Sequence, residues 1–462
     1  MKRFWLVMLS LGLVLAFSAS AMAVDVKFSG SFYAAGMYLD KTTLRNTNDG
    51  SDNVSTAFYF QRLRVQTDFI VSPGLKLVTR FDAMERAWGA PRTSATLSAT
   101  ADALLTKDSA GTTAENENIA FDWAYIEYAS PIGLLQVGLM EDGSTGTIFG
   151  NSLTTAGRIK YASTIGPVAI KADITKGKDQ SSTAKNIATV TDADNDKYGI
   201  EGVYAWKDGK AGMKVTYYNY AEKSPSATST PAGSNYKKKY FLFTPYAIAK
   251  VGPVNIQAEV NYATGSLKKY GDSLGDVSLS NLSAFVDATA TFGPVYFGGT
   301  FAYISGDDPN TSYKQEGGTL NGGQDWNPTL IMFSYYDRTY WVGALSGYDS
   351  LGNQGPMGSD SKSTTTLPGA WFGQGKIGMK PLAELDIMAS LSYATADQKP
   401  TGVLNNNFGW EVDVTGTYKI TNNLSYMLGV GYWFVGDYYK GSSNANTLRD
   451  NYMLINKLTL TF

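Results

Sequence analysis

The two ends of the chain carry the strongest constraints on its fold. Apolar and polar residues alternate through the last segment, Asn451–Phe462, and the chain finishes on an aromatic residue. At the other end a basic start precedes the apolar stretch Phe4–Phe17 and the small residues Ala21–Ala23, which is the layout of a secretion signal. We therefore expect residues 1–23 to be a cleaved signal peptide. No later apolar run of about 18 residues follows, which argues against a helical membrane protein.

The rest of the chain repeats one pattern, in which apolar and polar residues alternate with a period of two. The pattern is clearest in the segments 254–261, 282–291, 385–392 and 410–418. This period places successive side chains on opposite faces of a strand. The alternating segments are joined by short turns and by long polar loops in turn.

The connections have a consistent composition. The short turns are rich in glycine, proline or asparagine, which supply the dihedral angles that tight turns need. They lie at residues 72–74, 130–133, 165–167, 207–210, 251–253, 292–294, 380–382 and 421–423. The long loops, for example 40–56, 89–118, 178–196 and 222–235, are rich in Ser, Thr, Asn, Asp and Gly. A soluble sandwich would share the period of two but would not need hairpin after hairpin with one end so much longer.

These features predict an all-β fold, a transmembrane antiparallel up-and-down β-barrel formed by residues 24–462 as a single domain. Short turns of such a barrel lie in the periplasm and long loops lie outside the cell. Because both end strands have their free ends in the periplasm, the turns imply about 18 strands. The segments 329–336 and 339–343 leave the count open, because they could be a folded loop or an extra hairpin. About 16 or about 20 strands are the alternatives.

The composition excludes several classes of function. The chain has no cysteine, so it cannot form disulfides, thiolate metal sites or a lipid anchor at the cleavage point. It has no histidine, so an imidazole base is impossible and a zinc site would rest on carboxylates alone. We therefore expect no enzymatic activity, no cofactor and no metal. With 39 basic and 41 acidic residues, the charge is too balanced to predict nucleic-acid binding.

Two short charged motifs lie in predicted loops. Asp192, Asp194 and Asp196 stand at alternate positions of a loop and could bind calcium, but the later glutamate and the helices of an EF-hand are missing. The run Lys237–Lys239 is interpreted as a solvated loop or as a contact to lipopolysaccharide phosphates.

The segment 60–69 carries its basic residues on one face. Arg62 and Arg64 alternate with Leu63 and Val65, so one face is charged and the other apolar. An arginine that faces lipid at mid-bilayer costs roughly 2–4 kcal/mol, so turning both outward would cost on the order of 4–8 kcal/mol. The two arginines are therefore predicted to face the inside of the barrel.

The same alternation extends this basic inner face to neighbouring strands. After the turn at 72–74, Asp82 and Arg86 share the predicted inward face. The inward basic residues predicted in this way are Lys27, Arg62, Arg64, Lys76, Arg80, Arg158 and Lys160. Such a ladder, with carboxylates opposite, sets the field and the charge preference of a wet pore. The alternative is that these are solvated lumen residues, paired with Asp68 and Asp82 and without a tuned role.

The segment 141–157 combines adjacent carboxylates, Glu141 and Asp142, with several glycines and with the apolar Ile148 and Phe149. With this loop the whole mature chain resembles the Gram-negative trimeric porins, whose third long loop folds into the barrel and narrows it. The resemblance implies that 141–157 is the constriction loop, that its two carboxylates face the basic wall across an eyelet, and that the protein is a homotrimer. The loop lacks the Pro-Glu-Phe-Gly-Gly-Asp-like run of the best-known members. A count of 18 strands also matches the sugar-selective porins better than the general ones.

Together these observations predict a passive, water-filled channel of the bacterial outer membrane for small hydrophilic solutes and ions. Its other partners would be outer-membrane lipid and lipopolysaccharide. Two alternatives stay open. One is a channel selective for sugars or small organic anions. The other is a structural or partner-binding barrel, such as an adhesin, a phage receptor or a sheath around another outer-membrane component. A sheath would need a wide, unobstructed lumen.

Overall fold

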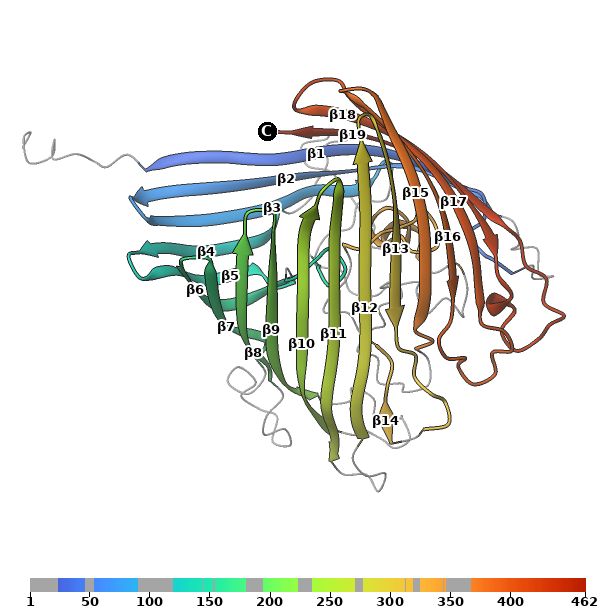
Figure 1. The fold of residues 1–462 in the computed structure, drawn as a ribbon, viewed down its shortest axis with the longest axis horizontal. Helices are drawn as coiled ribbons and strands as arrows, with labels where there is room; N and C mark the ends of the chain where they lie inside the picture. The colour runs from blue at the N-terminus through green and yellow to red at the C-terminus, as the bar shows by residue number, and fades with distance from the viewer. Residues whose placement is uncertain are drawn as a thin grey trace, which may run out of the picture.

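The chain folds into a closed antiparallel β-barrel of 18 wall strands (Figure 1), as the alternation predicts. The computed structural model describes residues 24–45, 54–89, 119–143, 145–152, 154–179, 194–222, 235–270, 277–311, 313–318, 325–343, 345 and 367–462. The predicted signal peptide, residues 1–23, lies outside the described residues. Among the described residues no helix is long and apolar enough to cross a membrane.

Every wall strand pairs with its two neighbours around the barrel. The first nine are β1 (Asp25–Leu39), β2 (Thr56–Ser72), β3 (Leu75–Ala87), β4 (Ala120–Ser130), β5 (Gly133–Glu141), β6 (Thr155–Ile165), β7 (Val168–Lys178), β8 (Asn195–Trp206) and β9 (Gly209–Glu222). The others are β10 (Asn235–Val251), β11 (Val254–Tyr270), β12 (Val277–Phe292), β13 (Val295–Ile304), β15 (Ala370–Leu382), β16 (Leu385–Thr395), β17 (Asn407–Lys419), β18 (Leu424–Val435) and β19 (Asn451–Thr461). The two-residue β14 (Lys314–Gln315) lies in a loop beside β12 and is not part of the wall.

The barrel closes where the last strand pairs with the first. β19 runs antiparallel to β1 from Ser31 opposite Thr461 to Leu39 opposite Met453. At the end of this seam the backbones of Gly30 and Phe462 exchange two hydrogen bonds, of 2.8 and 3.1 Å. Figure 1 shows the two strands side by side. Closure leaves no unpaired strand edge, which is the condition for a sheet to lie in lipid.

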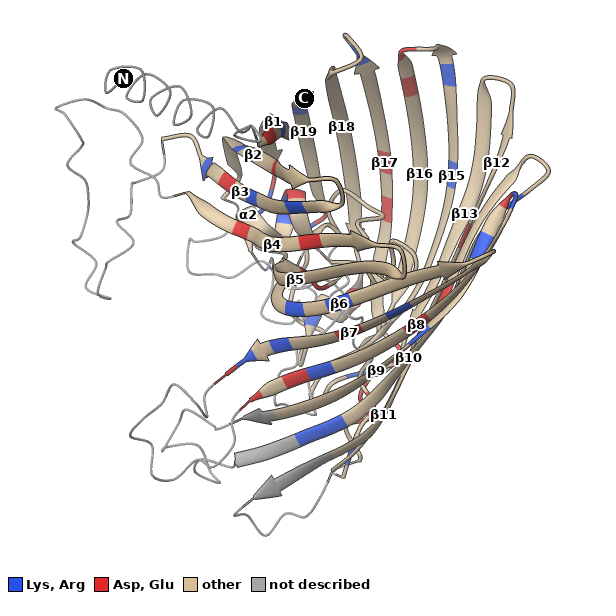
Figure 2. Cartoon of the chain, turned by 90° about the vertical axis from the view of Figure 1, so that its left-hand side faces the viewer, with Lys and Arg blue, Asp and Glu red and all other residues tan. Residues whose placement is uncertain are grey.

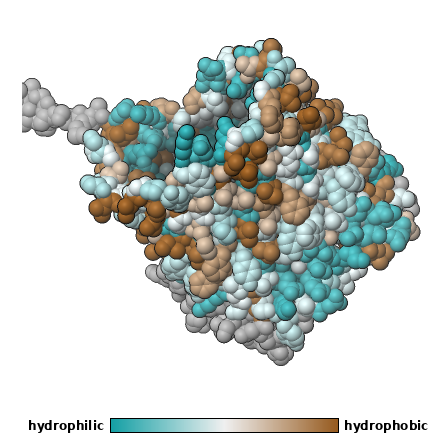
Figure 3. Space-filling view, in the orientation of Figure 1, coloured by the Kyte–Doolittle hydropathy of each residue, from teal (hydrophilic) through white to brown (hydrophobic). Residues whose placement is uncertain are grey.

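Alternate residues of the wall separate an apolar outer face from a polar inner face. On β6, Ile159 is 50% exposed and Tyr161 is 36% exposed, whereas Arg158, which precedes Ile159, is only 8% exposed. The same alternation continues around the barrel, with exposed apolar residues such as Ile126, Ile174 and Leu428. Figure 3 shows apolar residues spread over the wall on one side of the molecule. Lipid is the solvent that such an exterior requires.

One predicted turn lies elsewhere in the structure. β15 continues through residues 380–382, and the turn follows at Ala383 and Glu384. The register of β15 against β16 shifts between Met379 and Leu382. This irregularity accommodates Pro381, which has no backbone N–H to give to the ladder. Pro381, which we predicted to lie in a turn, therefore lies at the end of a strand.

A second correction concerns the basic run Lys237–Lys239, predicted to be a loop. β10 begins at Asn235, so the run belongs to a strand. Lys238 is only 5% exposed, and its ammonium lies 5.3 Å from the centre of the Tyr240 ring. The lysine is therefore packed inside the protein and is not a free surface charge.

The sequence left it open whether the segments 329–336 and 339–343 form a hairpin or a folded loop. In the structure they belong to a folded loop. It contains a π-helical turn, η2 (Tyr335–Thr339), followed by the short helix α2 (Tyr340–Val342). Apolar residues of this segment, including Trp326, Ile331 and Phe333, are buried in the largest hydrophobic cluster of the described chain. Many of the other members, for example Phe60, Phe372 and Trp433, come from wall strands, so this segment packs against the barrel wall.

Candidate functional site

The loop between β5 and β6, residues 142–154 and here named L3, runs along the inner wall as far as β12. The backbone N–H of Thr147 donates to Glu259 Oε2 on β11 at 2.6 Å, and the Thr147 hydroxyl donates to the same oxygen at 2.9 Å. Further on, the ring of Phe149 stacks on Phe285 of β12 with centroids 5.0 Å apart. Phe149 is fully buried, so an apolar anchor holds the tip of the loop.

Two glycines let L3 approach the carboxylate of Glu259. A Cβ at Gly146 would lie 2.3 Å from Oε2, and a Cβ at Gly150 would lie 2.3 Å from Oε1. Gly146 also has a φ of +81°, in the left-handed region that favours glycine. The glycines that the sequence shows in this loop are therefore required by a close contact with the opposite wall.

A second loop, residues 305–369 and here named L7, also enters the lumen. The backbone N–H groups of Ile331 and Met332 donate to the two carboxylate oxygens of Glu411 on β17, each at 2.6 Å. Glu411 is fully buried. Two hydrogen bonds to a buried carboxylate are strong because the acceptor is charged and the surroundings have a low dielectric. They fix L7 against the wall.

L3 and L7 touch each other inside the barrel. The backbone N–H of Asp325 donates to the carbonyl of Asn151 at 3.1 Å. The ring of Trp326 meets Phe149 edge to face, with centroids 5.1 Å apart. Burial raises the pKa of Asp325 on L7, against the effect of the hydrogen bond from Tyr336. The two loops thus support each other on the side of the lumen formed by β11, β12 and β17.

The opposite arc of the wall carries the predicted arginines. Arg64 of β2 makes a bidentate pair with Asp82 of β3, with both N–O distances 2.6 Å. Arg64 and Arg80 both lie 3.2 Å from Asp122 of β4. The guanidinium of Arg80 also lies over the ring of Trp123 at 3.4 Å. This part of the arc is a connected network of charges and not a row of free cations.

Irregularities in β3 and β4 decide which residues join this network. The register of β3 against β4 shifts between Arg80 and Phe81, which leaves Asp122 as an extra residue that turns toward the arginines. A second bulge lies at Met84, which has a φ of 56°. It places Arg86 opposite Gln61, on the other face from the network. The prediction that Arg86 shares the inner face is therefore wrong.

The predicted cations nearer the short turns lie beside carboxylates of the same face. The ammonium of Lys76 lies 2.9 Å from Asp68 and 3.2 Å from Glu127. Lys27 stands opposite Asp68 in the register of β1 against β2, so it shares the inner face. The sequence left open that the inward cations pair with Asp68 and Asp82. The structure shows these pairs, and it shows Asp122 and Glu127 as further partners.

A second group of charges lines β6 to β9 (Figure 2). Arg158 lies 3.1 Å from Asp173 and 3.6 Å from Asp142, and the second oxygen of Asp173 lies 3.2 Å from Lys214. Asp142 also forms an ion pair with Lys197. These contacts join the root of L3 to four neighbouring strands.

Lys160 differs from the other cations of this group. It stands opposite Asp173 in the register of β6 against β7. Among the described residues, however, no carboxylate oxygen lies within 4.0 Å of its ammonium, whereas Arg158, Lys197 and Lys214 each have such a partner. Lys160 therefore keeps more of its charge available to the lumen.

The predicted eyelet between Glu141, Asp142 and the arginines of β2 and β3 has a different arrangement. Asp142 pairs with Arg158 and Lys197 beside it, and the Glu141 carbonyl accepts a hydrogen bond from Arg158. The arginines of β2 and β3 are neutralised by carboxylates of their own arc. The wall thus carries two locally paired groups of charge.

The candidate calcium motif is partly described. Asp194 and Asp196 both contact the ammonium of Lys176, at 2.8 and 2.9 Å, and Asp192 lies outside the described residues. In the described part of the chain no group of three His, Cys, Asp or Glu residues is placed to hold a metal ion.

The sequence reasoning missed Glu259 and Glu411 as functional residues. Both lie on the polar face of clearly alternating strands, between Ala258 and Val260 and between Trp410 and Val412. A carboxylate at an inward position of a strand that is otherwise largely apolar could have indicated a loop anchor. Which loop it would hold depends on contacts between residues more than 75 positions apart.

Comparison with known proteins bears on the fold. No protein-family model matches the chain, and comparison with the curated proteins gives no match. OpdQ of Pseudomonas aeruginosa superposes with a TM-score of 0.50 at 12% identity, over 96% of this chain and 100% of that one. The outer membrane channel DcaP of Acinetobacter baumannii gives 0.43 at 12% identity over 96% and 99%. Pseudomonas aeruginosa OccK2 (OpdF), solved in complex with glucuronate, gives 0.47 at 12% identity over 94% and 98%. The chain is thus similar in fold to 18-stranded outer-membrane channels.

Proposed function

We propose that the protein is a passive, water-filled channel of the bacterial outer membrane through which small hydrophilic solutes and ions diffuse into the periplasm. One observation carries the proposal. Two loops enter the lumen and are held on one side by Glu259 and Glu411, while charged side chains line the facing arc of the wall. An apolar exterior holds such a barrel in lipid, and a charged interior holds water.

In this proposal the charged wall sets the ion preference of the narrowest part. The basic residues are the seven inward cations predicted from the alternation, and the acidic ones include Asp82, Glu141 and Asp142. Most of these cations have a carboxylate within 4.0 Å. At physiological salt the Debye length is about 8 Å, so screening would be incomplete wherever the lumen is about that wide or narrower. We expect modest selectivity, because locally paired charges largely cancel at that distance.

The alternatives are less well supported by the same features. A sheath around another component needs an open lumen, and the contact between L3 and L7 occupies part of it. An enzyme would have to work without histidine or cysteine. The homotrimer belongs to the proposal through the porin resemblance alone. The cleaved leader at 1–23 belongs to it through the sequence pattern of a secretion signal, and contacts to lipopolysaccharide through the proposed place in the outer membrane.

Single-channel recording in a planar bilayer tests the proposal. Purified protein should give stable conductance steps in potassium chloride, with a small reversal potential in a salt gradient. Steps that close in threes would support the trimer. Heat-denatured protein in the same detergent is the control. Absence of conductance at every salt concentration would overturn the channel function.

A further inference from the structure

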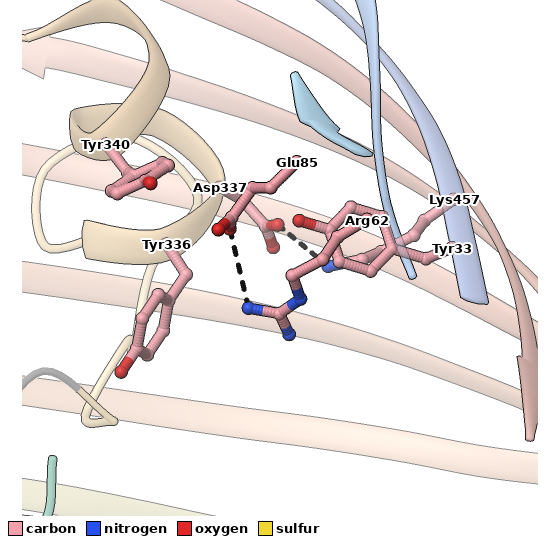
Figure 4. A pocket seen from close by; sticks show the side chains of 7 residues that line it. All are labelled: Tyr33, Arg62, Glu85, Tyr336, Asp337, Tyr340 and Lys457. Atoms are coloured by element: carbon pink, nitrogen blue, oxygen red, sulfur yellow. Dashed lines mark hydrogen bonds and ion pairs between the residues drawn. The ribbon is translucent and has the colours of Figure 1, made fainter. Parts of the chain in front are cut away.

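A cavity of about 150 Å³ lies between L7 and the inner wall near the seam of the barrel. The wall contributes Tyr33 of β1, Arg62 of β2, Glu85 of β3 and Lys457 of β19, and L7 contributes Asp337 and Tyr340. Figure 4 shows the charged groups and the tyrosine rings gathered around this space. No role follows for the cavity from the channel architecture, since it belongs to neither loop anchor.

The two ion pairs of this cavity differ in quality. The ammonium of Lys457 donates to Asp337 at 2.8 Å, which is a good charge-assisted hydrogen bond. Arg62, in contrast, lies 3.5 Å from Glu85 and 4.0 Å from Asp82. Among the described residues, the Arg62 guanidinium makes no hydrogen bond and its Nε is buried without a partner.

Glu85 also has hydrogen-bonding capacity that other described side chains do not use. Within the part of the chain that the structure describes, its carboxylate accepts no hydrogen bond and has only Arg62 as an ion-pair partner. The neighbouring Arg64 shows what a satisfied pair looks like on this wall, with two bonds of 2.6 Å to Asp82. The Arg62 and Glu85 side chains are 20% and 27% exposed, so both stay open to a ligand that enters the lumen.

We propose that this cavity is a binding subsite for a small zwitterion that carries a carboxylate and an ammonium on neighbouring atoms, as an α-amino acid does. The proposal rests on the channel function, since the subsite would select among passing solutes. The ligand carboxylate accepts hydrogen bonds from Arg62, and the ligand ammonium donates to Glu85. The 3.5 Å between these two side chains suits two opposite charges on adjacent atoms.

The balance of charge favours a zwitterion over an ion. The cavity holds two cations, Arg62 and Lys457, and two carboxylates, Glu85 and Asp337. A singly charged solute would satisfy one partner and leave the other unpaired, which carries a desolvation penalty. A neutral sugar would bring no charge to either member of the Arg62–Glu85 pair. The ring of Tyr33 already contacts Arg62 and Lys457, at 5.3 and 4.7 Å from its centre, so Tyr340 is the ring that offers a surface for the apolar part of an amino acid.

Blockade of single-channel current tests the subsite with defined probes. L-leucine is compared with 4-methylpentanoate, which lacks the ammonium, with 3-methylbutylamine, which lacks the carboxylate, and with glucose. We expect leucine to bind at least about tenfold more tightly than each of the other three, because each lost charge removes a charge-assisted hydrogen bond. Equal or tighter binding of any one of them would overturn the proposal.

A matched pair of variants locates the site. Glu85→Gln should weaken leucine about tenfold or more and leave 4-methylpentanoate unchanged, because only the ammonium contact is lost. Glu127→Gln removes an inward carboxylate of β4 that pairs with Lys76, away from the cavity, and should leave leucine binding as in the parent. Unchanged leucine binding in Glu85→Gln would contradict the assignment.

Calorimetry separates this inference from the proposed function. Titration of leucine into the detergent-solubilised protein measures binding without conduction. Binding without any conductance would overturn the channel and keep the subsite. Conductance without leucine binding would keep the channel and overturn the subsite.

Discussion

Glu259 on β11 and Glu411 on β17 hold two different loops by the same device. Each is a buried carboxylate on the inner wall that accepts backbone N–H groups from a loop inside the barrel, Thr147 for L3 and both Ile331 and Met332 for L7. The two carboxylates are 2% and 0% exposed. Burial of a charge is tolerated when hydrogen bonds surround it, so each loop and its glutamate depend on each other.

Replacing Glu411 by alanine should release L7. Two hydrogen bonds to a charged acceptor are lost and two backbone N–H groups are left unsatisfied, so docking weakens by roughly 3 kcal/mol or more. We expect a larger and noisier single-channel conductance and a lower melting temperature. Glu411→Gln keeps one hydrogen-bond acceptor, so its conductance and melting temperature should lie between those of the parent and of the alanine variant. Glu384→Ala in the short turn between β15 and β16 is the control. A conductance equal to that of the parent would show that Glu411 does not hold the loop.

A methyl group added at Gly150 should displace L3. The new Cβ would lie 2.3 Å from Glu259 Oε1, a distance that requires the loop or the carboxylate to move. We expect Gly150→Ala to change the conductance in the same direction as Glu259→Ala. Gly202→Ala on β8 is the matched control, because a Cβ there meets nothing within 4 Å. Similar conductance in the Gly150 and Gly202 variants would contradict the proposed close contact.

Neutralising Arg64 should shift the ion selectivity toward cations. Arg64→Gln removes one positive charge and leaves Asp82 and Asp122 with less compensation, so the arc becomes more negative. The reversal potential in a potassium chloride gradient measures the shift. Lys380→Gln makes the same charge change at an exposed strand end near Asp386 and should have a much smaller effect. Equal shifts in both variants would mean that the arc does not control selectivity.

The loop after β13 should hold more tightly in acid than at neutral pH. Burial raises the pKa of Asp307 to about 6, and its Oδ1 accepts the N–H of Glu316 at 2.8 Å. Because the folded pKa lies above the unfolded value, the stabilisation is complete at low pH and is lost as the pH rises through about 6. Hydrogen exchange of the Glu316 amide, corrected for its intrinsic rate, should give a larger opening free energy at about pH 5 than at about pH 7.5.

Asp307→Asn provides the control for this pH effect. The amide does not titrate in this range, so the opening free energy should become independent of pH between the same two conditions. A pH dependence that persists in the variant would assign the effect to another group.

The strands and their faces could be predicted from the sequence because a period of two is a local property. The alternation at Arg62 and Arg64 gave the correct face, since an outward arginine is expensive in lipid. It failed at Arg86, where the bulge at Met84 changes the phase. A bulge adds one residue without a composition signal, so the phase after it cannot be read from the pattern.

The contents of the lumen were harder to predict. The alternating carboxylates at Glu259 and Glu411 mark inward positions, but their partners come from loops far away in the chain. The pairing of Asp142 with Arg158 and Lys197 in place of the arginines of β2 and β3 likewise depends on how far L3 follows the wall. Such long-range choices are set by packing of Phe149 and its neighbours, which a single sequence does not reveal.

The seam between β1 and β19 constrains the order of assembly. Its contacts join residues as distant as Asn456 and Gly36, which are 420 positions apart. Bringing such distant segments together costs chain entropy, and the last strand must exist before the sheet can close. L3 and L7 are tied to wall strands that lie between the two edges, and a sealed cylinder gives them only the end openings to enter by. Once the seam has closed, an undocked L3 or L7 can reach its anchor only through an end of the barrel, so we expect docking of the loops to be easier before closure.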